Sequence, residues 1–152
     1  MLRFTISSIF IALLSIACSA EESEPVSDLP IVQVYKSPTC GCCSKWVSHL
    51  EANGFTVEAT DVNDMTLVKR GYGIPPALAS CHTAVVGDYL VEGHVPAEDI
   101  VQLLKLKPPI KGISVPGMPI GSPGMEGKNP QTYDVVSFGA NGEIEVFSRH
   151  QP

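Results

Sequence analysis

The sequence predicts an α/β domain in which helices flank a mixed β-sheet. Segments with the character of strands alternate with segments of helical periodicity from residue 31 to residue 106. A Gly/Pro/Met-rich loop over residues 111–130 and a C-terminal β-hairpin then follow. About 130 residues remain after the N-terminal 20, which is enough for one domain with its own hydrophobic core. We expect this domain to span residues 31–150.

The first half of the domain begins with a strand, a helix and a second strand. Residues 31–36 form an apolar run between two prolines, which is typical of a buried strand. A helix is predicted over residues 43–53, because Trp46 and Leu50 recur at helical spacing and a glycine follows. Residues 55–60 alternate as a second strand does. We interpret Trp46 as a packing residue of this helix.

A short helix, a hairpin and a longer helix come next. Acidic side chains can cap a short helix over residues 64–70, and glycines can end it. Residues 83–86 and 89–92 predict a hairpin with a two-residue Gly-Asp turn. Pro96 suits the first turn of a helix over residues 97–106. This order of elements is that of a thioredoxin-like fold, with a parallel crossover first and an antiparallel hairpin later.

The C-terminal part changes in composition. The loop over residues 111–130 repeats Pro-Gly-Met at a spacing of seven residues. It is longer than an ordinary connection, and ordered loops of this length are often functional. Residues 133–138 and 143–148 around a Gly-Ala-Asn-Gly turn predict a second hairpin.

The N-terminus has the pattern of a secretory signal peptide over residues 1–20. A basic Arg3 precedes an apolar run over residues 9–16, and small residues follow at 17–20. The run is much shorter than the ~18–20 residues that span a bilayer. We therefore expect export rather than a transmembrane anchor.

Cys18 allows a second processing route, in which the chain is cleaved before this cysteine and carries a lipid on its thiol. Ser15 stands where a lipoprotein signal usually has leucine, so the match to that signal is imperfect. Residues 21–30 are acidic and polar and predict a flexible tether. A lipid on Cys18 would be the one link of the chain to a membrane.

The charge of the chain argues against two classes of partner. The formal net charge is −6, and basic residues are spread along the sequence without a cluster. Nucleic acids and acidic membrane surfaces bind clusters of positive charge, so we expect neither as a partner.

Cys40, Cys42 and Cys43 fall at the predicted turn from the first strand into the first helix. The N-terminus of a helix favours thiolate over thiol, through its free N–H groups and its partial positive charge. Cys40 and Cys43 have the Cys-x-x-Cys spacing of thiol–disulfide oxidoreductases. Cys42 would compete in such a redox pair, whereas a third sulfur favours binding of a soft metal. Both interpretations remain open from these residues alone.

Cys81 and His82 precede the third predicted strand, at a place that faces the helix N-terminus in thioredoxin-like folds. We expect them to lie opposite the three thiols. His94, in the turn after the next strand, is either a further ligand or a surface histidine. His49 is expected to face solvent from the first helix.

Met118 and Met125 are weaker candidates for the same site. Their thioether sulfurs are ligands that Cu(I) selects. Methionine is also a common filler of irregular hydrophobic gaps, and that interpretation is the stronger of the two.

Several blocks of the chain, in this order, resemble one known family. The blocks are residues 35–43 with Trp46, then 80–85, 91–96, 116–119 and 121–126. They resemble an exported bacterial family of thioredoxin-like metal-binding proteins, once classed as a domain of unknown function and typified by the copper-resistance protein CopG. The resemblance covers roughly residues 31–148.

The resemblance implies copper binding in the periplasm and a role in copper tolerance. It places metal binding on four cysteines and two histidines. These residues are Cys40, Cys42, Cys43, Cys81, His82 and His94. Copper ions, and other periplasmic copper-handling proteins, are the partners that follow.

Two functions therefore remain to be compared. In the first, the thiolates hold Cu(I) as a small sulfur-bridged cluster, because the neighbours Cys42 and Cys43 cannot easily both point at one ion. In the second, the chain is a thiol–disulfide or Cu(I)/Cu(II) oxidoreductase that uses Cys40 and Cys43 as catalytic residues. Zinc is an alternative metal, since cysteine and histidine also suit it.

Overall fold

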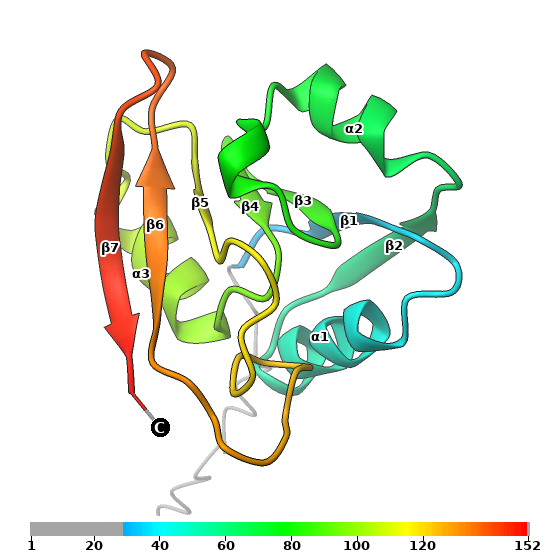
Figure 1. Ribbon diagram of the computed structural model, residues 1–152. Coiled ribbons are helices and arrows are strands. Elements are labelled where there is room, and N and C mark those ends of the chain that lie inside the picture. Colours follow the sequence, from blue (N-terminus) through cyan, green and yellow to red (C-terminus); the bar gives the residue numbers. More distant parts are fainter. Residues whose placement is uncertain (1–28, 152) are drawn as a thin grey trace, which may run out of the picture.

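The computed structural model describes residues 29–151 as a seven-stranded mixed sheet with helices on both faces (Figure 1). The elements, in chain order, are β1 (Val32–Lys36), α1 (Gly41–Ala52), β2 (Val57–Asp61), α2 (Met65–Tyr72), the short 3₁₀ helix η1 (Pro76–Leu78), β3 (Thr83–Val86), β4 (Tyr89–Glu92), α3 (Ala97–Leu106), β5 (Gly112–Ser114), β6 (Tyr133–Phe138) and β7 (Ile144–His150).

The strands lie in the order β2-β1-β3-β4-β5-β6-β7. The pairs β1/β2 and β4/β5 are parallel, and the other neighbouring pairs are antiparallel. Each parallel pair is joined by a helical crossover, α1 in the first case and α3 in the second. The predicted mixed α/β class is confirmed, and the order from β1 to α3 is compatible with a thioredoxin-like arrangement.

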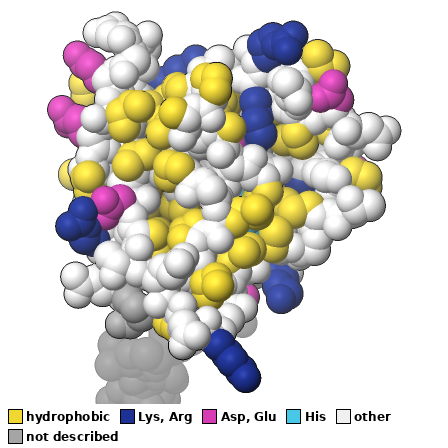
Figure 2. Space-filling model, in the orientation of Figure 1, with side chains coloured by type: hydrophobic (Ala, Val, Ile, Leu, Met, Phe, Trp, Pro, Cys, Tyr) yellow, Lys and Arg dark blue, Asp and Glu magenta, His cyan; other side chains and the backbone are white. Residues whose placement is uncertain are grey.

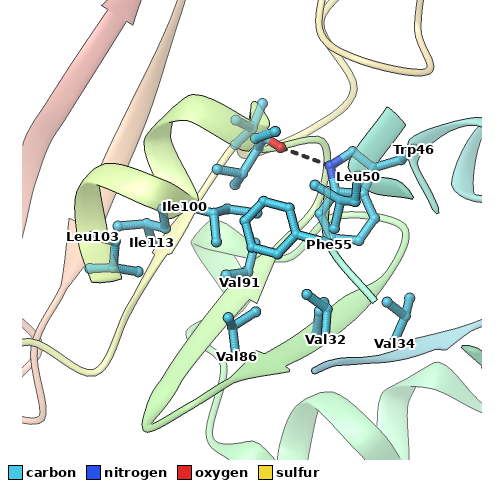
Figure 3. Close-up of a cluster of buried hydrophobic side chains, with 14 of the residues drawn as sticks. Val32, Val34, Trp46, Leu50, Phe55, Val86, Val91, Ile100, Leu103 and Ile113 are labelled. Carbon is cyan, nitrogen blue, oxygen red and sulfur yellow. Dashed lines mark hydrogen bonds between the residues drawn. The ribbon is translucent and has the colours of Figure 1, made fainter. Parts of the chain in front are cut away.

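One face of the sheet, covered by α1 and α3, carries the main hydrophobic core (Figure 3). Alternate strand residues such as Val32 and Val34 point into it, and Val91 does so from β4. Trp46 of α1 is fully buried there, and its indole Nε1 donates a 2.8 Å hydrogen bond to the carbonyl of Val95. The prediction that Trp46 is a packing residue is confirmed.

The opposite face is covered by η1 and by the segment that follows α2. Ile74, Leu78, Leu90 and Phe138 form a second, smaller cluster there. The residues of α2 itself are half-buried or exposed. This helix is therefore held to the domain mostly by partly buried and polar contacts.

Most predicted elements are present, with boundaries shifted by a few residues. The helix expected over residues 43–53 begins two residues earlier, at Gly41, so Cys42 and Cys43 lie within its first turn. The hairpin β3/β4 and the helix α3 have the predicted bounds. The second predicted hairpin is β6/β7, with a register shift at Val135/Val136.

The main correction concerns the segment after α3. The sequence predicts one loop over residues 111–130, but residues 112–114 form β5, which lies between β4 and β6 in the sheet. The strand has three residues and begins with glycine, so it carries no alternation that could be recognised. The long loop therefore runs from residue 115 to residue 132.

The described residues do not include the predicted signal peptide, with Cys18, or most of the predicted tether. Among residues 29–151, no helix combines the length and the apolar character that crossing a bilayer requires.

Gly112 gives a test of how β5 is inserted. A Cβ at this position would overlap the Leu90 carbonyl group, with the carbonyl carbon only 2.8 Å away. We expect Gly112→Ala to lower the free energy of unfolding by about 1–3 kcal/mol, as overpacking does. Chemical denaturation measures this change.

Gly71→Ala is the matched control, because a Cβ at Gly71 has nothing within 4 Å. This change should leave stability unaltered or raise it by up to about 1 kcal/mol. Equal effects of the two changes would contradict the close packing of β4 and β5.

Candidate metal centre

Three cysteines lie at the N-terminus of α1, as the sequence predicts. Cys40 precedes the helix in an extended conformation, and a disulfide with an S–S distance of 2.04 Å joins it to Cys43. Cys42 is a free thiol whose Sγ lies 3.4 Å from the Sγ of Cys40. In the described chain, no side chain caps this helix end and no acidic residue stands in its first turn. The helix dipole and the free N–H groups are therefore available to negatively charged sulfur.

The second half of the centre comes from the turn before β3 and the turn after β4. Cys81 Sγ lies 2.9 Å from His94 Nε2 and 3.3 Å from His82 Nδ1. The ligand atoms of Cys40, Cys42, Cys43 and Cys81 all lie within 4.8 Å of one another, and so do those of Cys81, His82 and His94. Cys81 belongs to both groups and connects them.

His94 is fully buried and held in one tautomer. Its Nδ1 lies 2.7 Å from the carbonyl oxygen of Pro123, which can only accept, so Nδ1 carries the hydrogen. Burial lowers the pKa of His94. In the neutral ring, Nε2 therefore presents its lone pair to Cys81. A carbonyl that binds the second ring nitrogen is the usual support of a metal-ligating histidine.

His82 is buried between Trp46 and His94, with ring centroids 4.3 Å and 5.0 Å away. Burial, and then the nearby His94 and Lys69, lower the pKa of His82 well below its ordinary value. Its Nε2 is buried without a hydrogen-bond partner among residues 29–151. His82 is therefore a neutral imidazole, the form in which histidine binds metals.

The ligand side chains around Cys81 are uncharged in the metal-free protein. Burial and the neighbouring Cys42 raise the pKa of the Cys81 thiol to about 12. The metal-free centre thus holds a protonated thiol beside two neutral imidazoles. A metal ion would replace the thiol proton and neutralise the thiolate that remains. Sulfur and imidazole donors fit Cu(I) and Zn(II).

The loop of residues 115–132 lies over this centre and beside α1 (Figure 1). A Cβ at Gly124 would lie 2.7 Å from the carbonyl oxygen of Cys42 and 2.9 Å from the backbone nitrogen of Trp46. The positive φ of +83° at Gly124 also favours glycine. Only a glycine backbone can approach the start of α1 this closely.

A cleft of about 270 Å³ leads from the surface to Cys81, and Gly117 and Met118 line its other side. Met118 is 51% exposed at this cleft, and Met125 is half-buried in the loop. Hydrophobic side chains gather over the middle of this view of the molecule, and most charged ones lie towards its margins (Figure 2).

The structure brings together the six strongest candidates from the sequence, Cys40, Cys42, Cys43, Cys81, His82 and His94. Of the two interpretations left open for His94, the surface histidine is excluded, because His94 is fully buried under the loop. The expectation for His49 is wrong. This residue is half-buried, and its Nε2 accepts a hydrogen bond from the backbone N–H of Ala97.

Two further groups support the centre and were not predicted from the sequence, the carbonyl of Pro123 and the side chain of Glu92. Glu92 is the last residue of β4 and is fully buried. Burial raises the pKa of its carboxyl group, and the nearby Lys69 lowers it. A single acidic residue at the end of a predicted strand gives no signal of burial. The burial of residues 90–97 appears only when the sheet and the loop are assembled.

These observations define a class: a mixed α/β protein whose cysteine–histidine cluster can hold a metal. A family model described as "Protein of unknown function, DUF411" matches residues 78–125, which include Cys81, His82 and His94. Among curated proteins, no sequence matches.

Two solved structures are similar over most of the chain. They are named "Copper resistance protein copG- Form 2" and "Copper resistance protein copG- Form 1", with 43% and 42% identity and TM-scores of 0.76 and 0.77. The matches cover 81% and 82% of this chain and 98% and 100% of those chains. The chain belongs to the CopG family.

The raised pKa of Cys81 predicts an unusual pH dependence of its alkylation. The rate should rise about tenfold per pH unit from pH 7 to pH 10, because only the thiolate reacts. A thiol with the ordinary pKa of 9.0 would approach a plateau within that range, whereas Cys81 at about 12 would not. Mass spectrometry of the peptide that contains Cys81 measures the rate, with free glutathione as the reference. A plateau near pH 9 would contradict the burial of this thiol.

Proposed function

We propose that this chain binds copper, as Cu(I), and serves copper resistance in the periplasm. The observation that carries the proposal is the position of Cys81, whose sulfur lies within 4.8 Å of the three cysteine sulfurs at the N-terminus of α1 and of two buried imidazoles. Copper is the metal that appears in the names of the two similar solved structures. Soft thiolates select Cu(I), and imidazole is compatible with it.

The sulfur positions support binding of several ions rather than one. Cys42 and Cys43 are neighbours on the first turn of α1, so their side chains leave the helix in different directions. Thiolates that bridge adjacent ions accommodate this arrangement. Full use of the cluster requires two electrons and two protons to convert the Cys40–Cys43 disulfide into two thiols.

The number of donor atoms and a nearby methionine favour Cu(I) over zinc. Zinc would be satisfied by four of these donors in a closed tetrahedral site. Here six donors converge, and the thioether of Met118 lies at the cleft that leads to Cys81. Met118 and Met125 are proposed as weaker contributors during binding or release of copper.

The periplasmic location rests on the signal peptide expected over residues 1–20. Cleavage there, or lipid attachment at Cys18, would place the folded domain of residues 31–150 outside the cytoplasm. Other periplasmic copper-handling proteins are the proposed partners for delivery or removal of the metal.

Titration of the reduced protein with Cu(I) tests this function. In a Cys18→Ser background, we expect the chain to bind more than one Cu(I). Replacing Cys40, Cys42 and Cys43 together by serine should weaken Cu(I) binding by more than ~10–100-fold, which is the typical loss when a residue that hydrogen-bonds to a metal ligand is removed. Competition with a chromogenic Cu(I) chelator measures the affinity.

Ser44→Ala is the matched control, because Ser44 is exposed in the same turn of α1. Binding by the triple variant that equals that of the control would place the copper site elsewhere. A stoichiometry of one Cu(I) would contradict the bridged cluster.

A thiol–disulfide oxidoreductase is the second candidate, and the Cys40–Cys43 disulfide at a helix N-terminus favours it. The close approach of Cys42 to Cys40 argues against efficient turnover, since a third thiol competes for the mixed disulfide. We expect the metal-free protein to reduce insulin slowly and Cys42→Ser to accelerate it. Rapid reduction by the unaltered chain without metal would favour the oxidoreductase instead.

A further inference from the structure

We propose that Glu92 is a positioning residue of the metal centre, whose carboxylate fixes the turn that carries Cys81 and His82. The metal-binding part of this proposal rests on the proposed function. The geometry that supports it belongs to the metal-free protein.

The carboxylate binds both ends of the Cys81-His82 dipeptide. Glu92 Oε1 accepts a 2.6 Å hydrogen bond from the backbone N–H of Ser80, the residue before Cys81. Glu92 Oε2 accepts a 2.6 Å hydrogen bond from the hydroxyl of Thr83, the residue after His82. One fully buried side chain therefore constrains the backbone on one side of the dipeptide and the side chain on the other.

Lys69 of α2 completes the set of donors. Its Nζ lies 2.6 Å from Glu92 Oε1 and 3.1 Å from Thr83 Oγ1. The Glu92 side chain is 0% exposed and that of Lys69 is 15% exposed. A buried carboxylate is unfavourable unless it is paired and hydrogen-bonded, and these partners supply both.

Glu92 also connects the turn to His94. The chain continues from Glu92 to Gly93, whose N–H donates a 3.0 Å hydrogen bond to the carbonyl of His82. His94 then places its Nε2 against Cys81. The Cys81-His82 turn and the Glu92–His94 segment thus form one hydrogen-bonded unit, which comes from a different part of the chain than the three cysteines at the start of α1.

Cys81 and His82 can be probed independently of the cysteines at the start of α1. Such measurements distinguish a positioning role of Glu92 from a merely structural one. Loss of a structural contact would lower stability without a specific effect on Cys81. Loss of a positioning contact should loosen Cys81 and His82 while the folded domain and the α1 cysteines stay as they are. Outer partners of metal ligands typically contribute about 10–100-fold to metal affinity.

Glu92→Gln in the full chain tests the proposal, because the amide keeps the shape but has one acceptor oxygen instead of two. The first measurement uses metal-free protein: alkylation of Cys81, read by peptide mass spectrometry, and the imidazole resonances of His82 and His94. We expect faster alkylation of Cys81, a smaller change for Cys42, and shifted resonances. The second measurement uses Cu(I) alone against a chromogenic chelator, and we expect about tenfold weaker binding.

Thr83→Val and Thr83→Ser keep the test valid when Glu92→Gln does not fold. The first removes one donor to Glu92 at nearly constant shape, and the second retains the hydroxyl. Thr83→Val should reproduce the effects on Cys81 to a smaller extent, and Thr83→Ser should resemble the unaltered chain.

A folded Glu92→Gln chain with unaltered Cys81 alkylation and unaltered resonances would overturn the positioning role. Where only the threonine variants fold, identical behaviour of the two would overturn it. Failure of the unaltered chain to bind Cu(I) would instead refute the proposed function, and the metal-free measurements would still decide the role of Glu92.

Discussion

The contact between Trp46 and the turn after β4 is the interaction on which the centre depends. The indole of Trp46 donates a hydrogen bond to the carbonyl of Val95 (Figure 3). Its ring also packs against His82. Trp46 stands three residues after Cys43 on the same helix, so this contact fixes the distance between the α1 thiols and the imidazoles. Truncation of a buried tryptophan typically costs about 3–5 kcal/mol, which is a large part of the stability of a domain this size.

The centre combines a rigid frame with electrically neutral ligands. Its imidazoles are neutral because burial disfavours their charged forms, and the Cys81 thiol stays protonated for the same reason. The buried carboxylate of Glu92 is paired with Lys69. The ligands therefore carry no net charge without a metal, and a soft cation can enter by replacing thiol protons.

The sequence predicts those parts of the structure that depend on local pattern. Helical spacing and Pro96 locate α3, and the Gly-Asp turn locates the β3/β4 hairpin. The order of elements also places Cys81-His82 opposite the thiols of α1, because a fold of this order fixes which turns meet. Contacts made across the sheet carry no local pattern, so β5, the burial of His94 and the pairing of Glu92 with Lys69 appear only in three dimensions.

The glycine- and proline-rich composition of residues 111–130 conceals β5 in the sequence, and it also lets the loop close over the metal centre. Glycine and proline suppress the periodicity by which a strand such as β5 is recognised. At Gly124, the absence of a side chain lets the loop touch the backbone of Cys42 and Trp46. At Pro123, the carbonyl oxygen fixes the hydrogen of His94 on Nδ1. Because both features use backbone atoms, the loop can orient the ligand Nε2 towards Cys81 without placing a competing side chain in the metal site.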